Sequence, residues 1–278
     1  MKLNTNRARN FIAGVALACL VAGCATVPET GRKQLRLIPE SEEMQLGLAA
    51  FEKLKKETPI SKDAAANEML QRVGQRIAAV APLPNAKWEF VLFENKEPNA
   101  FCLPGGKVGV YTGILEITRD EAGLATVVAH EVAHAVARHG AERLSEALVI
   151  EAGAQLLGVT LSSADPRTQA AVATAYGVGT TLGRVLPHSR EQESEADYIG
   201  LIYMARAGYD PEAAIAFWQR FAEYNKRRGG NFMPAFLRTH PLDETRIRQL
   251  QAWLPKAKEE YLRRSATQGV TPQTPARK

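Results

Sequence analysis

The most informative segment of the sequence is Leu124-Ala125-Thr126-Val127-Val128-Ala129-His130-Glu131-Val132-Ala133-His134. Its apolar first half predicts a buried helix, and residues four apart on a helix share one face. The imidazoles of His130 and His134 can therefore reach a single metal ion, with Glu131 close beside it. An ordinary helix with two surface histidines is the alternative that this motif alone leaves open.

A metal site of this kind needs a third protein ligand. The metzincin pattern requires glycine at position 137 and histidine at position 140, but the chain has Ala137 and Gly140, which excludes that class. A carboxylate can instead come from the helical segment 189–197, where Glu193 and Asp197 lie four apart. Glu193 can bind zinc, and Asp197 can accept a hydrogen bond from the ring N–H of a histidine ligand. A helix that merely begins with acidic residues is the alternative.

With these two helices the chain resembles a known family, the gluzincin metallopeptidases of the HtpX and CAAX-prenyl-protease type. The resemblance is greatest to their periplasmic bacterial lipoprotein branch, the BepA-like and LoiP-like proteins. It runs from Thr30 to Pro241 and rests on the His-Glu-x-x-His and Glu-x-x-x-Asp helices. It implies one Zn²⁺ per chain, held by His130, His134 and Glu193, and peptide-bond hydrolysis by water that Glu131 deprotonates as general base.

Two further segments resemble family features. His240, in Thr239-His240-Pro241, would be a catalytic donor to the oxyanion or a displaceable extra metal ligand, and a simple helix-capping role is the third alternative. Arg246 could also face the site. The stretch 99–113 resembles the strand beside the cleft, which implies that an extended substrate pairs with its edge. The residues expected to bind substrate are Gly106, Lys107, Val108, Gly109 and Val110.

The N-terminus predicts export and lipidation. A basic start precedes the apolar run 11–22, which is too short to span a bilayer. It ends in Val21-Ala22-Gly23-Cys24, which resembles a lipobox and implies cleavage before Cys24 and acylation of that residue. An ordinary secretory signal is the alternative. Because Ala25 is not the aspartate of inner-membrane retention, the resemblance implies an outer-membrane anchor facing the periplasm. Only Cys102 would remain in the folded region, so no internal disulfide is expected.

The expected fold class is α+β, mainly α: a gluzincin domain with a small β-sheet beside the active-site helix, the two motif helices crossing beneath that sheet. Short β-rich runs at 88–93 and 107–111 enclose the turn Pro104-Gly105-Gly106, whereas long helices are expected elsewhere, including one over 120–146. The predicted organisation is a signal peptide over 1–23, a lipidated tether over 24–37, the metallopeptidase domain over 38–265 and a disordered tail over 266–278. His139 and His188 are expected at the surface.

The distribution of charge along the chain indicates which classes of binding partner are expected. The formal net charge of +5 comes from the two ends of the chain, because residues 1–23 hold three basic and no acidic residues and the stretch from Pro255 holds six basic and two acidic ones. The nearly neutral body gives no support for nucleic-acid binding. The resemblance implies protein or peptide substrates, a membrane contact through the lipid anchor, and a link to the outer-membrane assembly machinery.

The expected function is an endopeptidase for misfolded or misassembled envelope proteins. A largely latent or inactive zinc-binding chaperone for outer-membrane proteins is the alternative. The presence of Glu131 favours the enzyme, because a binding protein needs no general base.

Overall fold

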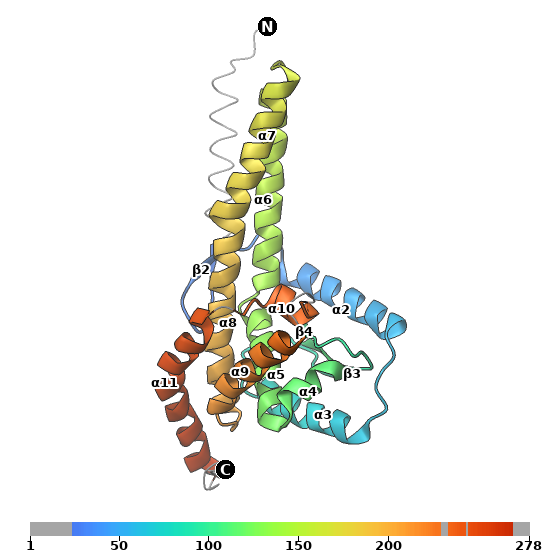
Figure 1. Cartoon of the computed structure of the whole chain (residues 1–278), viewed down its shortest axis with the longest axis vertical. Coiled ribbons are helices and arrows are strands. Elements are labelled where there is room, and N and C mark those ends of the chain that lie inside the picture. Colours follow the sequence, from blue (N-terminus) through green and yellow to red (C-terminus); the bar gives the residue numbers. More distant parts are fainter. Residues whose placement is uncertain (1–23, 229–232, 243, 269–278) are drawn as a thin grey trace. The chain divides into compact units, whose positions relative to one another are not determined.

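The computed structural model describes residues 24–228, 233–242 and 244–268 (Figure 1). These residues divide into two compact units, one of residues 24–42 and 138–186, the other of residues 43–137 and 187–268. The predicted signal peptide and residues 269–278 of the predicted tail lie outside the described part of the chain. The chain is mainly helical with small sheets, as the sequence predicts.

The second unit holds most of the helices and the larger sheet. Its elements are α2 (Glu40–Glu57, from Glu43 onward), α3 (Ala64–Ala78), β3 (Glu89–Phe93), β4 (Ala100–Leu103), β5 (Lys107–Tyr111), η1 (Thr112–Ile114), α4 (Leu115–Thr118), α5 (Glu121–Val136), α8 (Leu186–Arg206, from Pro187 onward), α9 (Glu212–Arg227), α10 (Ala235–Thr239) and α11 (Glu244–Gln268). Helix α11 thus extends three residues past the predicted boundary at 265.

The three strands pair in the order β3-β5-β4. Strand β4 is antiparallel to β5, with Ala100 opposite Val110, and the hairpin turn between them is made by Gly105 and Gly106, whose φ angles are +82° and +79°. Glycine is favoured there because side chains clash at positive φ. The sequence predicted the turn at 104–106, with a hairpin-like return between the runs 88–93 and 107–111. These runs form β3 and β5, which are parallel, and the strand that pairs with β5 across the turn is instead β4.

Helix α5 is the central helix of this unit. Asp120 caps its N-terminus by accepting a hydrogen bond from the backbone N–H of Gly123. Every residue from Gly123 to His134 is buried, as expected for a helix that is apolar on all sides. The helix packs against α3, α9, β4 and β5. It ends before Arg138, whose φ of 55° breaks the predicted helix 120–146 into α5 and α6.

Helix α8 approaches α5 closely where Gly200 faces His130. A Cβ atom on Gly200 would lie 3.0 Å from both the Cα and the backbone N of His130. Such contacts are too short for a side chain, so glycine permits the helices to approach. This close approach brings the segment 193–197 of α8 to the motif histidines.

Aromatic side chains cover the neighbouring side of α5. Trp218 and Phe221 of α9 stack at 6.1 Å between ring centroids, and Phe236 of α10 stacks on Phe221 at 5.5 Å. Phe236 also lies 4.6 Å from the ring of His240. All three aromatic rings are fully buried, which holds the imidazole at the end of α10 in a rigid apolar setting.

The first unit contains a two-stranded sheet and a helical hairpin. Its elements are β1 (Cys24–Thr26), β2 (Lys33–Leu35), α6 (His139–Thr160), α7 (Pro166–Thr180) and the short π-helical η2 (Thr181–Val185). Strand β1 is antiparallel to β2, so part of the predicted tether 24–37 is folded. Among the described residues, the structure shows no helix with the length and hydropathy needed to cross a bilayer.

Candidate metal centre

Four side chains of the second unit converge at the C-terminal half of α5. His130 and His134 lie one helical turn apart, and their Nε2 atoms are 3.1 Å from each other. Glu193 of α8 places Oε2 3.4 Å from His130 Nε2 and Oε1 3.3 Å from His134 Nε2. His240, directly after α10, places Nδ1 2.9 Å from Glu193 Oε2 and 3.1 Å from His130 Nε2. Potential ligand atoms of these four residues all lie within 4.8 Å of one another.

These spacings suit a tetrahedral zinc ion. Ligand atoms about 2.0–2.1 Å from a tetrahedrally bound zinc lie roughly 3.3 Å apart, close to the separations found here. Three imidazoles and one carboxylate are also donors that zinc accepts. The Nε2 atoms of His130 and His134 both point into the same small space instead of toward separate hydrogen-bond partners. A shared cation explains this arrangement.

The charge of the site also fits a divalent cation. Glu131, Glu193 and Asp197 are all buried, and Arg246 is the buried guanidinium among them. Three carboxylates beside one guanidinium leave two negative charges that a metal ion, or protons on the imidazoles and on Glu131, must balance, because uncompensated buried charge is strongly unfavourable. A dication would neutralise the set.

Asp197 and Arg246 support the histidine ligands. Asp197 Oδ1 lies 2.9 Å from His130 Nδ1, the ring atom that faces away from the cluster. The guanidinium of Arg246 binds both oxygens of Asp197, each at 2.6 Å, and lies 3.5 Å above the ring of Trp218. Arg246 also donates to the carbonyl of Pro241 at 3.2 Å. This chain of contacts fixes the orientation of the His130 ring and connects it to the segment that carries His240.

The buried carboxylates differ in their acidity. Burial raises the pKa of Glu131, whose Oε1 is buried without a hydrogen bond and lies 3.3 Å from His240 Nε2. For Glu193 burial acts in the same direction, but His134, His130 and His240 outweigh it and lower the pKa well below the usual range. Glu193 is therefore held as an anion, whereas Glu131 is more basic than a solvated carboxylate, as suits a proton acceptor.

A family model of peptidase family M48 matches residues 64–254, which contain all four converging side chains. The chain belongs to peptidase family M48. The predicted resemblance is thereby confirmed, and with it the expectation of zinc, because M48 metallopeptidases are zinc-dependent.

Relatives within M48 come from two settings. Mitochondrial metalloendopeptidase OMA1 of Schizosaccharomyces pombe is 40% identical over 188 residues, which cover 68% of this chain and 53% of that protein. The β-barrel assembly-enhancing protease of Escherichia coli is 27% identical over 285 residues, covering 97% of this chain and 58% of that protein. A putative β-barrel assembly-enhancing protease of Vibrio cholerae is 30% identical over 228 residues, covering 80% of this chain and 46% of that protein. The chain thus spans about half the length of these M48 relatives.

The strand that was predicted to bind substrate at its edge lies in the centre of the sheet. Residues Gly106 to Val110 were expected to present a free strand edge, but β5 is the central strand and pairs with β3 on one side and β4 on the other. That prediction is wrong, because both backbone edges of β5 are already hydrogen-bonded. Strand propensity and turn residues locate a strand in the sequence but do not specify its neighbours.

Strand β4 has the free edge of this sheet. The outer side of β3 is partly covered, since Ile60 forms a bridge with Phe93 and Ser61 donates to the carbonyl of Leu92. No strand of residues 24–228, 233–242 or 244–268 pairs with the far side of β4. Strand β4 packs against α5, and burial, together with the charge of Glu131, raises the pKa of Cys102. The open edge therefore lies close to the motif helix.

The prediction that His139 lies at the surface is also wrong. His139, the first residue of α6, is fully buried, because the chain turns at Arg138 and leads this residue into the first unit. The side chain of His188 lies outside the described part of the chain. Cys24 is exposed and Cys102 half-buried, and no disulfide joins them.

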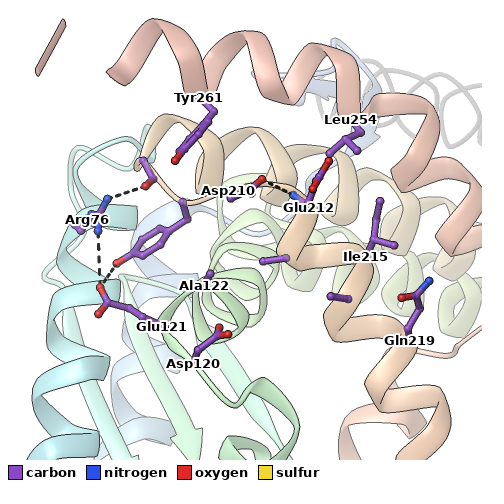
Figure 2. Close-up of a pocket in the computed structure, with 14 residues that line it drawn as sticks. Arg76, Asp120, Glu121, Ala122, Asp210, Glu212, Ile215, Gln219, Leu254 and Tyr261 are labelled. Atoms are coloured by element: carbon purple, nitrogen blue, oxygen red, sulfur yellow. Dashed lines mark hydrogen bonds and ion pairs between the residues drawn. The ribbon is translucent and has the colours of Figure 1, made fainter. Parts of the chain in front are cut away.

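A hollow separate from the metal centre lies between α3, α5, α9 and α11 (Figure 2). It has a volume of about 1110 Å³. Figure 2 shows Glu121, the first residue of α5, as the centre of its polar contacts: Tyr209 donates to Glu121 at 2.8 Å, and Arg76 lies 3.7 Å from the same oxygen. Because Arg76 also donates to the carbonyl of Ala207 at 2.9 Å, this network joins α3 and α5 to the segment that follows α8. Arg76, Glu121 and Tyr209 thus bind one another, and the group of side chains that could hold a metal ion lies elsewhere in the unit, at the four-residue cluster.

We expect the Asp197→Asn variant to bind zinc roughly 10- to 100-fold more weakly than the parent, because the amide no longer stabilises the Nδ1–H of His130 as a carboxylate does. Competition with a chromogenic chelator measures this affinity. The matched control is Glu191→Gln, an exposed residue of the same helix, which should leave the affinity unchanged. Equal affinities for all three proteins would show that Asp197 does not support the metal site.

Proposed function

We propose that this M48 chain is a zinc-dependent endopeptidase that hydrolyses misfolded or misassembled proteins of a bacterial envelope. The observation that carries the proposal is the convergence of His130, His134 and Glu193, with the basic carboxylate of Glu131 beside them. The names of its relatives, metalloendopeptidase and β-barrel assembly-enhancing protease, support proteolysis and, for the second, an envelope role.

In the proposed reaction His130, His134 and Glu193 hold the zinc ion. When bound, zinc polarises the scissile carbonyl and makes water more acidic. Glu131 accepts the proton of the attacking water and returns it to the leaving amine, a role that suits a carboxylate whose pKa burial has raised. Asp197 keeps His130 in the tautomer whose Nε2 lone pair faces the cluster, since it accepts the Nδ1 proton.

His240 is proposed to be a displaceable fourth ligand. Its Nδ1 lies within 2.9–3.1 Å of Glu193 and His130, at the fourth corner of the cluster, while its Nε2 lies 3.3 Å from Glu131. A substrate and its attacking water need that corner, so catalysis requires the imidazole to withdraw. This arrangement also favours a second candidate function, that of a largely latent zinc-binding assembly factor.

Substrate is proposed to pair with β4. Hydrogen-bonded and non-hydrogen-bonded pairs alternate along antiparallel strands. Since Tyr111 donates to the carbonyl of Asn99, the next hydrogen-bonded partner of β5 is Phe101, and Ala100 and Cys102 direct their backbone groups to the open edge. An extended peptide at that edge would lie beside α5, with its carbonyl groups near Glu131.

The envelope location is proposed from the N-terminus. Acylation of Cys24 after the lipobox-like Val21-Ala22-Gly23 would attach the protein to the periplasmic face of the outer membrane, where unassembled outer-membrane proteins and their assembly machinery are found. Cys24 is exposed on β1 and so accessible to acyl chains.

The Glu131→Gln variant should retain zinc but cleave casein at least about a hundredfold more slowly than the parent, because it lacks the general base. Elemental analysis and a casein assay on the same zinc-loaded samples measure both quantities. Glu191→Gln again serves as control and should match the parent. Undiminished cleavage by Glu131→Gln would rule out the proposed mechanism.

The His240→Ala variant distinguishes the two roles of this histidine. If His240 is a removable ligand, casein cleavage at saturating zinc should increase several-fold, because the fourth corner is free in every molecule. If it donates to the oxyanion, cleavage should instead fall by roughly 10²–10³. The initial rate in excess zinc is the measurement, and a fall would overturn the ligand role.

The Cys102→Pro variant tests the β4 edge. Proline lacks the outward N–H and is tolerated on edge strands, so kcat/KM for casein should fall roughly two- to tenfold while the protein stays folded. The matched control is Cys102→Val, which removes the thiol but keeps the N–H and should behave as the parent. Equal losses in both variants would mean that the side chain, not the strand edge, is what matters; circular dichroism verifies the fold of each.

A further inference from the structure

The helical hairpin of the first unit exposes an unusual amount of apolar surface. Figure 1 shows α6 and α7 side by side as a long hairpin, with β2 near one end of α6. Between Ala147 and Leu182 the only charged residues are Glu151, Asp165 and Arg167. Helix α7 has no buried residue at all. We refer to residues 147–182 as the arm.

Exposed apolar side chains of the arm fall into stripes. On α6, Leu148, Leu156 and Val159 recur at helical spacing, with exposed fractions from 48% to 72%, and Leu144, just before the arm, lies on the same face. The opposite face of α6 packs on α7, where Tyr176 donates to the carbonyl of Ile150. Helix α6 therefore has two apolar faces, and the described residues of the first unit cover only one of them.

Cys24 belongs to the same unit as the arm. It pairs with Leu35 of β2, and the neighbouring Arg32 binds both carboxylate oxygens of Glu142 on α6, at 2.7 and 2.8 Å. Leu37 also donates to Ser145 Oγ at 2.9 Å. The proposed acylation site is thus fixed to the first turns of α6, from which the arm extends.

We propose that the arm lies along the surface of a lipid bilayer, with its exposed apolar stripes among the acyl chains. The proposal rests on the lipid-anchored location proposed above, because acylated Cys24 would bring this unit to a membrane. The interfacial orientation follows from length: Ala147 to Leu161 spans about 21 Å at 1.5 Å per residue, more than one leaflet's hydrocarbon depth of roughly 15 Å. Upright insertion would bury Asp165 and Arg167 in hydrocarbon, whereas a flat arm leaves them at the interface.

The test uses the whole zinc-loaded mature chain carrying Cys24→Ser, so that no acyl chain contributes to binding. Its probe is sedimentation with vesicles of phosphatidylethanolamine and phosphatidylglycerol. The arm variant adds Leu148→Gln, Leu156→Gln and Val159→Gln. The matched control instead adds Leu46→Gln, Ile60→Gln and Leu262→Gln, at residues of the second unit with comparable exposures of 49–54%.

The Cys24→Ser parent and the control should partition to vesicles equally, and the arm variant at least roughly tenfold more weakly. Equal partitioning of all three proteins, or none, would overturn the proposal. So would a parent that forms dimers in analytical ultracentrifugation and loses them in the arm variant without a change in vesicle binding, because a second copy would then cover the stripes.

Two further measurements separate this proposal from the proposed function. Casein cleavage by the arm variant should equal that of the parent, since the arm contains no residue of the metal centre. Radiolabelled palmitate incorporation into the unaltered chain tests the anchor at Cys24 by itself. A chain that is not acylated but still partitions through the arm would refute the anchor and leave the arm's membrane contact established.

Discussion

Buried negative charge is the constraint on which the catalytic unit depends. Glu131, Glu193 and Asp197 are removed from water around three imidazoles, and Arg246 compensates only one of them. A divalent cation at the centre of this group would balance the remaining charge, so metal binding is expected to stabilise the folded unit. The same burial makes Glu131 a stronger base and leaves Glu193 anionic through its imidazole neighbours.

The rest of the unit holds these groups in position. Helix α5 is buried along most of its length, α8 approaches it at Gly200, and the aromatic wall around Phe236 supports the His240 ring. Catalytic geometry is best maintained on such packed elements rather than on loops. Arg246 connects two sides of the site, because it binds both Asp197 and the carbonyl of Pro241.

Local spacing in the sequence was enough to predict the centre, but not its surroundings. Pairs four residues apart, such as His130 with His134, lie on one face wherever the helix goes, and the hairpin turn depends on adjacent glycines. The strands that pair with β5 and the burial of His139 depend on contacts between residues that are far apart in the chain. The periodicity of the sequence does not reveal such contacts. The break at Arg138 was missed because its positive φ occurs at a residue type that gives no warning.

The shortness of β4 has a consequence for selectivity. Four residues extend only about 14 Å, and just two of them, Ala100 and Cys102, direct backbone groups outward. A polypeptide that pairs there as proposed would gain few main-chain bonds, each contributing roughly 0.5–1.5 kcal/mol. Affinity of this size does not select a cleavage sequence. The open edge of β4 would instead select for conformation, because a substrate segment must be unfolded from its own sheet or helix before it can pair with that edge. An enzyme built in this way would distinguish chains by whether they have finished folding, and mature proteins beside it would be spared.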